Sequence, residues 1–221
     1  MIKLITDLGD AAFLLPAAVV VALHLFLSKS VRAAVIWLSA VFLCGILTIW
    51  AKLIFHVCGD QLLGWQIASP SGHTSLSTTF YVCGAVLMSQ ERARWTRIAL
   101  MLGGILVVVA IGVSRIRLGA HTPAEVFAGW VIGLFCVAWF AAILLTRKME
   151  VLPWAGLAGV IVAVALLMHG RNIGVETRLD RWVEQIRLAG YGGLLACPAG
   201  WESEQMRQVR APQAMPPAAA R

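Results

Sequence analysis

The chain has 221 residues, of which 60% are hydrophobic and only 13% are charged. A soluble domain usually carries about a quarter charged residues, so this composition excludes an ordinary soluble protein and indicates a surface that mostly faces lipid. The formal net charge of +7 does not indicate a nucleic-acid partner, because much of the positive charge lies in short loops between apolar segments, where it serves membrane topology.

Six long apolar segments follow one another along the chain. A bilayer is spanned by roughly 20 apolar residues in a helix, and backbone groups inside lipid must find their hydrogen bonds within the segment. The segments lack the alternation of apolar and polar residues that barrel strands show. We therefore predict an all-α integral membrane protein with about six transmembrane helices in a bundle. The segments are residues 11–27, 34–55, 74–90, 98–113, 124–146 and 153–169.

The first segment is predicted to be a retained helix and not a cleaved signal peptide. Lys3 is followed by Asp7 and Asp10, whereas a signal peptide begins with a positively charged region. No small-x-small cleavage site follows the apolar run.

The connections after the first, third and fifth segments are basic and are predicted to face the cytoplasm. The second and fourth connections, and the N-terminus, are then predicted to face outward. The basic residues are Lys29 and Arg32, then Arg92, Arg94 and Arg97, then Arg147 and Lys148.

The composition changes near residue 170, so we predict a transmembrane domain over residues 1–170 and an extension over 171–221. Residues 176–188 carry apolar side chains at helical spacing and predict an amphipathic helix. It either lies on the membrane surface or contacts the protein's own loops, and the last residues are expected to be disordered. Cys58 and Cys197 would both face outward, which leaves a disulfide between them open.

Polar residues gather where the predicted helices meet the outer side of the membrane. The first group lies near the end of the second segment and just before the third. The second group lies just after the fourth segment and at the start of the fifth. The alternation of spans brings these groups to one face. They are Lys52, Ser71, Gly72 and His73, then Ser114, Arg115, Arg117, His121 and Glu125.

These residue types together suit phosphoryl transfer through a histidine. Lysine and arginine cations bind phosphate, and Ser71 and Gly72 stand at a helix N-terminus, where backbone N–H groups attract anions. Two histidines supply a nucleophile and a proton donor. A carboxylate such as Glu125 can fix the tautomer of a histidine and stabilise its positive charge.

The same residues resemble the type 2 phosphatidic acid phosphatases, a family related to the vanadium haloperoxidases. Pro70-Ser71-Gly72-His73 matches the PSGH motif of that family, and Ser114-Arg115 followed after five residues by His121 matches SR-x5-H-x3-D. The resemblance implies that His121 is the nucleophile and His73 the acid that protonates the leaving oxygen. It implies no metal and no cofactor, and its phosphate ligands are Lys52, Ser71, Gly72 and Arg115.

Two departures from the family pattern bear on activity. The first family motif is K-x6-RP; Lys52 fits its lysine, but Gly59 and Asp60 stand where Arg-Pro is expected. Arg117 is a candidate to replace the missing cation. Glu125 stands in place of the aspartate of the third motif and is one methylene longer.

Structural roles compete with these functional ones. Thr122-Pro123-Ala124-Glu125 has the pattern of a capping box with proline at the first helical position, and this role of Glu125 is compatible with a catalytic one. The cations Lys52, Arg115 and Arg117 could instead anchor helix ends to lipid headgroups.

The sequence predicts a phosphatase or pyrophosphatase that hydrolyses a lipid phosphate through a phosphohistidine intermediate. The expected partners are the lipid phosphate substrate and membrane lipids. The expected location is a bacterial inner membrane, with the active site on the periplasmic or extracellular side. Two alternatives remain: a degenerate family member that binds or transports anionic lipid without cleaving it, and a lipid phosphotransferase.

Overall fold

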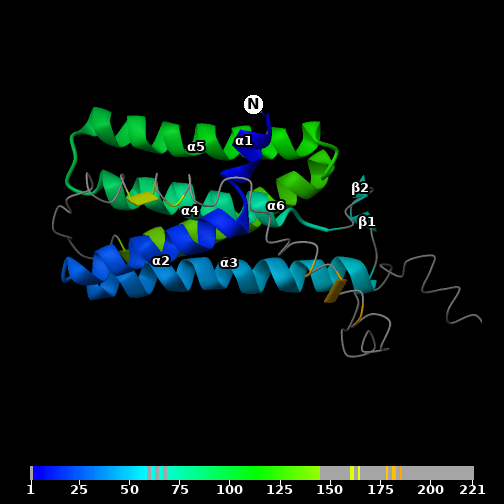
Figure 1. The fold of residues 1–221 in the computed structure, drawn as a ribbon, viewed down its shortest axis with the longest axis horizontal. Coiled ribbons are helices and arrows are strands. Elements are labelled where there is room, and N and C mark those ends of the chain that lie inside the picture. Colours follow the sequence, from blue (N-terminus) through cyan, green and yellow to red (C-terminus); the bar gives the residue numbers. More distant parts are fainter. Residues whose placement is uncertain are drawn as a thin grey trace, which may run out of the picture.

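The computed structural model describes residues 2–58, 61–62, 65–66 and 69–144, and seven single positions between 160 and 185. The described residues form a helical bundle with one very short antiparallel strand pair (Figure 1). The elements are α1 (Ile2–Asp7), α2 (Ala11–Leu27), α3 (Val31–Cys58), β1 (Gln61–Leu62), β2 (Trp65–Gln66), α4 (Gly72–Ser89), α5 (Arg94–Arg117) and α6 (Pro123–Leu144).

The predicted all-α fold is confirmed for the first five apolar segments, which correspond to α2, α3, α4, α5 and α6. Helix α1 and the strand pair were not predicted. The sixth segment, 153–169, lies outside the described residues except at three positions, of which Ile161 and Val164 contact the core. Of the 176–188 helix only single positions are described, and neither Cys197 nor the side chain of Cys58 is described.

Three of the described helices are long and apolar enough to cross a membrane: α3 over Val31–Phe55, α5 and α6. Helix α2 is apolar but shorter. Helix α5 turns many apolar side chains outward, as expected of a helix that faces lipid. Its exposed apolar residues include Trp95, Leu102, Ile105, Leu106 and Val109.

Helix α4 is the central helix of the bundle, and Figure 1 shows it between α5 and the pair formed by α2 and α3. It carries hydroxyl side chains that are nevertheless buried, because they donate to carbonyl groups three or four residues earlier in the same helix. Thr78 Oγ1, for example, donates to the carbonyl oxygen of Thr74 at 2.6 Å. Across helices, the hydroxyl oxygens of Thr48 and Ser75 lie 2.9 Å apart.

The apolar core is organised around Trp37 of α3, which is 1% exposed. Its indole N–H donates to the carbonyl oxygen of Ala18 in α2 at 2.9 Å. Its ring makes edge contacts with Phe80 of α4 and Phe140 of α6, with ring centroids 5.3 and 6.3 Å apart. One satisfied aromatic side chain therefore ties four helices together.

Helices α4 and α6 approach closely because α6 presents two glycines to α4. A Cβ atom at Gly129 would stand 2.7 Å from the carbonyl oxygen of Ser71, and one at Gly133 would stand 2.5 Å from Cβ of Thr78. Gly129 and Gly133 are four residues apart, the small-xxx-small spacing that lets membrane helices come together. This contact brings the first turn of α6 against the first turn of α4.

Candidate active site

The first turns of α4 and α6 are joined by a backbone hydrogen bond. The N–H of Ser71, which caps α4, donates to the carbonyl oxygen of Glu125 at 3.1 Å. The two predicted motifs, one at each helix start, are therefore in direct contact.

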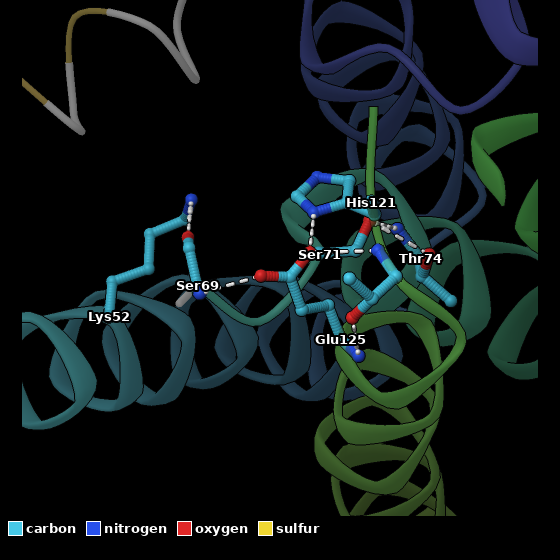
Figure 2. Close-up of polar contacts among 7 residues, drawn as sticks. Lys52, Ser69, Ser71, Thr74, His121 and Glu125 are labelled. Atoms are coloured by element: carbon cyan, nitrogen blue, oxygen red, sulfur yellow. Dashed lines mark hydrogen bonds and ion pairs between the residues drawn. The ribbon is translucent and has the colours of Figure 1, made fainter. Parts of the chain in front are cut away.

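Glu125 is the centre of a hydrogen-bond network at this junction (Figure 2). Its Oε1 accepts from the N–H of Ser69 at 3.0 Å. Its Oε2 accepts from the N–H of Thr122 at 3.0 Å and lies 3.0 Å from Nδ1 of His121. The side chain is buried, and three hydrogen bonds stabilise it in the ionised form.

The network fixes the tautomer of His121. An ionised carboxylate can only accept hydrogen bonds, so Nδ1 of His121 carries the proton that points to Glu125. A neutral imidazole with its proton on Nδ1 keeps a lone pair on Nε2. In this tautomer, Nε2 is the ring atom of His121 that can act as a hydrogen-bond acceptor or a nucleophile.

The predicted capping box is present as well. Thr122 Oγ1 accepts from the N–H of Glu125 at 3.3 Å, while the Glu125 carboxylate accepts from the N–H of Thr122. Glu125 therefore caps α6 and contacts His121 at the same time. The longer side chain, compared with the aspartate of the family motif, still reaches the imidazole.

Lys52 is joined to this network through a residue that the sequence analysis missed. Lys52 is 1% exposed, and its Nζ donates to Oγ of Ser69 at 2.6 Å. Figure 2 shows Ser69 between Lys52 and Glu125, with its hydroxyl toward the lysine and its backbone toward the carboxylate. A buried ammonium group is costly unless it meets an anion or hydrogen-bond partners, and the hydroxyl of Ser69 is one such partner for Lys52.

Ser71 has a clear structural role in the described site. Its Oγ accepts from the N–H of Thr74 at 3.4 Å and from Thr74 Oγ1 at 2.9 Å, as an N-cap does. Gly72 is the first residue of α4. The N-terminus of α4 therefore lies against the first turn of α6, to which the N–H of Ser71 donates at Glu125.

His73, the second residue of α4, contacts an acidic residue from the N-terminal part of the chain. Its Nε2 lies 3.5 Å from Oδ2 of Asp10, and the two side chains are 12% and 19% exposed. Asp10 also caps α2, because its Oδ1 accepts from the N–H of Ala12 at 2.7 Å.

The residues predicted at the end of α5 differ in their placement. Arg115 is half-buried, and its Nη1 donates to Oγ1 of Thr6 at 3.5 Å. Ser114 is buried, and its hydroxyl donates to the carbonyl oxygen of Ile111 in its own helix at 2.7 Å. Arg117 is exposed at the last position of α5.

The structure thus links Lys52, Ser71, His121 and Glu125 through hydrogen bonds, and connects His73 and Arg115 to the N-terminal segment that holds Thr6 and Asp10. Gly59 and Asp60 lie outside the described residues. Three contacting residues were not predicted as part of the site: Ser69, Thr6 and Asp10. The signal for Ser69 was its position directly before the PSGH motif, and the signal for Asp10 was its place as a capping residue before an apolar run.

Within the part of the chain that the structure describes, no group of three or more His, Cys, Asp or Glu side chains is arranged to hold a metal ion. The chemistry available at this site is that of imidazole, carboxylate, hydroxyl and cationic groups.

Comparison with known proteins identifies a family for this region. The model of the PAP2 superfamily matches residues 57–149. An uncharacterized 22.5 kDa protein in the cps region of Klebsiella pneumoniae is 29% identical over 174 residues, which are 76% of this chain and 82% of the relative.

Two named enzymes are also similar. Glucose-6-phosphatase 3 of Homo sapiens is 30% identical over 58% of this chain and 44% of its own length. Undecaprenyl-diphosphatase of Sulfolobus acidocaldarius is 36% identical over 29% of this chain and 27% of its own length. The chain therefore matches less than half the length of either enzyme. No solved structure matches the chain.

Proposed function

Residues 57–149 of this chain belong to the PAP2 superfamily, and from this premise we propose that the protein is a membrane-bound phosphatase that hydrolyses a lipid phosphate or lipid diphosphate. The reaction proceeds through a phosphohistidine on His121. The protein needs no cofactor for this chemistry.

The observation that carries the proposal is the contact between His121 Nδ1 and Glu125 Oε2 at 3.0 Å. It leaves Nε2 of His121 as the nucleophile and places a negative charge where the imidazole becomes positive during attack. A merely structural capping box would not require a histidine at that place.

In the first step, the lone pair on His121 Nε2 attacks phosphorus, and the bond from phosphorus to the leaving oxygen breaks. His73 gives a proton to that oxygen, so that the lipid leaves as an alcohol or as a monophosphate. Lys52, Arg115 and the backbone N–H groups at the start of α4 stabilise the charge on the remaining phosphoryl oxygens.

In the second step, water attacks the phosphohistidine. His73, now neutral, accepts a proton from the water as the bond between phosphorus and Nε2 breaks. Inorganic phosphate leaves, and His121 returns to its starting tautomer with Glu125 still bound at Nδ1. Ser114 and Arg117 are assigned a supporting role in holding the anion, which is weaker for Arg117 because it is exposed.

A lipid substrate is supported by the long apolar helices on which these residues stand and by the similarity to an undecaprenyl-diphosphatase. The polar residues stand at helix ends, the level at which lipid headgroups meet a membrane protein. A lipid that carries a phosphomonoester or a diphosphate presents its phosphate at this level.

The proposal includes a topology. Six transmembrane helices within residues 1–170 cross a bacterial inner membrane, and residues 171–221 form an extension. The basic connections face the cytoplasm by the positive-inside rule, so the active site opens to the periplasmic or extracellular side.

The proposed function is tested by phosphate release from a panel of lipid phosphates with purified protein. The panel holds a polyprenyl diphosphate, phosphatidate, phosphatidylglycerol phosphate and a phosphorylated lipid A. Wild type should release phosphate from at least one member, and His121→Ala should lower kcat on the order of 10³-fold or more. Arg92→Gln, on the loop at the opposite end of α4, should leave the rate unchanged.

Other results identify the alternatives. Equal and negligible release by wild type and His121→Ala from every lipid would refute the hydrolase hypothesis. Retained lipid binding would then indicate a degenerate family member that does not cleave the lipid. The absence of Arg-Pro at Gly59 and Asp60 would explain that loss of activity. Transfer of phosphate to an added lipid alcohol, in place of release to water, would indicate a phosphotransferase. An acid-labile phosphate on wild type that His121→Ala lacks would identify the intermediate.

A further inference from the structure

The N-terminal segment before α2 contributes an acidic residue to the site, although it lies outside the residues that the family model matches. Asp10 uses one carboxylate oxygen to cap α2 and turns the other toward His73, at 3.5 Å from Nε2. The backbone N–H groups at the start of α2 stabilise the ionised form of this carboxylate.

His73 needs such a counter-charge if it is to donate a proton. It lies in the first turn of α4, where the positive end of the helix disfavours an imidazolium ion. The buried ammonium of Lys52 and the guanidinium of Arg115 belong to the same end of the bundle and act in the same direction. A carboxylate within 4 Å opposes these effects and favours the protonated histidine.

The segment that carries Asp10 is held against α4 and α5 by contacts of its own. Tyr81 of α4 donates its hydroxyl proton to the carbonyl oxygen of Leu8 at 2.9 Å, and Arg115 of α5 donates to Thr6. At Gly9 a Cβ atom would stand 2.7 Å from Cγ2 of Ile111, so this turn lies directly on α5. Asp10 is therefore fixed in position by its own helix and by its neighbours in the chain.

We propose that Asp10 is a positioning residue for the general acid: its carboxylate holds His73 by Nε2 and stabilises the imidazolium that protonates the leaving oxygen. The proton given up is the one on Nδ1, and the neutral imidazole keeps its Nε2 proton toward Asp10. The electron pair of the breaking P–O bond goes to the leaving oxygen, which takes that proton. This inference rests on the proposed function, because it assigns His73 the role of acid.

The test separates the charge of Asp10 from its role as a helix cap. Asparagine and serine are good capping residues without charge, whereas glutamate keeps the charge. Asp10→Asn, Asp10→Ser and Asp10→Glu are purified with wild type and His73→Ala, and thermal unfolding identifies any variant that fails to fold. Each is assayed with the best lipid phosphomonoester of the panel, whose leaving group is an alkyl oxygen, and with p-nitrophenyl phosphate.

The two substrates differ in how much they need an acid. An alkyl oxygen must be protonated as it leaves, whereas p-nitrophenolate leaves without a proton. We expect Asp10→Asn and Asp10→Ser to lower kcat for the lipid phosphate about tenfold to hundredfold, part of the usual effect of general acid catalysis. The kcat of these two variants for p-nitrophenyl phosphate should fall less than about threefold. Asp10→Glu should recover most of the kcat that the neutral variants lose on the lipid phosphate. His73→Ala should likewise lose more activity on the lipid phosphate than on p-nitrophenyl phosphate.

Equal losses on both substrates would show that Asp10 acts only through structure, and would overturn the inference. Wild-type rates in Asp10→Asn on the lipid phosphate would overturn it as well. Both results leave the proposed function intact as long as wild type is active and His121→Ala is not. If wild type releases phosphate from no lipid of the panel, the proposed function fails first and the assignment of Asp10 fails with it.

Discussion

At the scale of single residues, Glu125 combines two tasks that the sequence suggested separately. Its Oε2 is shared by the N–H of Thr122 and the imidazole of His121, while Oε1 accepts from Ser69. The capping box holds the carboxylate in place, and the carboxylate holds the histidine. A change at this residue should therefore affect both the fold of the first turn of α6 and the chemistry of His121.

Substitution of Glu125 by glutamine tests this double role. In glutamine, an NH2 group replaces one of the two carboxylate oxygens and faces an N–H donor where an acceptor is needed. A buried polar group left without a hydrogen-bond partner costs roughly 1–3 kcal/mol. The substitution also removes the negative charge that stabilises the imidazole of His121 when it becomes positive. We expect Glu125→Gln to lower kcat about 10²-fold to 10⁴-fold, as removal of the orienting carboxylate does in a catalytic triad, measured by phosphate release.

Glu125→Asp is the matched control, because it keeps the charge and restores the side chain of the family motif. Its kcat should stay within about tenfold of wild type, since one methylene changes distance but not hydrogen-bonding capacity. A fully active Glu125→Gln would contradict the assigned role of the carboxylate.

Ser69 shows how a small residue connects two charged ones. Its hydroxyl oxygen accepts from Lys52, and its backbone N–H donates to Glu125. Ser69 thereby keeps an ammonium and a carboxylate in the same network while leaving the ammonium next to the start of α4. Ser69 directly precedes the PSGH motif, so the motif by itself does not include every residue of this hydrogen-bond network.

At the scale of elements, the contact between α4 and α6 positions the site. The close approach depends on Gly129 and Gly133, where a side chain would collide with Ser71, Thr74 or Thr78 of α4. Small residues at a helix interface matter in lipid because packing replaces much of the hydrophobic driving force there.

Gly129→Ala should therefore separate the two helix starts and weaken both stability and activity. Overpacking of this kind typically costs about 1–3 kcal/mol, and the affected contact is the carbonyl oxygen of Ser71. We expect a lower midpoint of thermal unfolding in detergent, as measured by tryptophan fluorescence, and a lower kcat.

Gly84→Ala, in α4, is the matched control. A Cβ atom there would meet no heavy atom of another described helix within 4 Å, and alanine is the better helix former. Its unfolding midpoint should equal or exceed that of wild type. If Gly129→Ala behaved like Gly84→Ala, the close approach would not be required for the site.

At the scale of the whole molecule, the bundle separates two ends of different chemistry. The phosphate-binding candidates lie where α3 and α5 end and where α4 and α6 begin. The basic turn between α2 and α3 and the loop between α4 and α5 lie at the other ends of those helices. In a membrane this polarity assigns the two ends to opposite faces.

The orientation can be measured with single cysteines in a variant that lacks Cys58 and Cys197. Ala120 is exposed between α5 and α6, beside His121, and Arg92 is exposed between α4 and α5. We expect Ala120→Cys to react with a membrane-impermeant maleimide in intact cells or spheroplasts, and Arg92→Cys to react only after lysis. The reverse pattern would place the site on the cytoplasmic side and contradict the proposed topology.

The sequence by itself determined the class of protein and the family that it resembles. Long apolar segments are local properties of the chain, and they predicted five of the described helices. The PSGH and SR-x5-H motifs are also local, and the predicted resemblance is confirmed by the match to the PAP2 superfamily over residues 57–149. Counting spans was enough to expect the motifs at one end of the bundle.

Only the tertiary structure decided which side chains meet. Ser69 and Glu125 are 56 residues apart in the sequence, yet they are hydrogen-bonded. Asp10 and His73 stand at the starts of two helices that are far apart in the sequence, yet their side chains are in contact. These contacts depend on the depth at which glycines let α6 approach α4 and on the turn at Gly9 that seats the N-terminal segment on α5. Packing depth and turn geometry are set by many side chains together, so no short pattern along the chain encodes them.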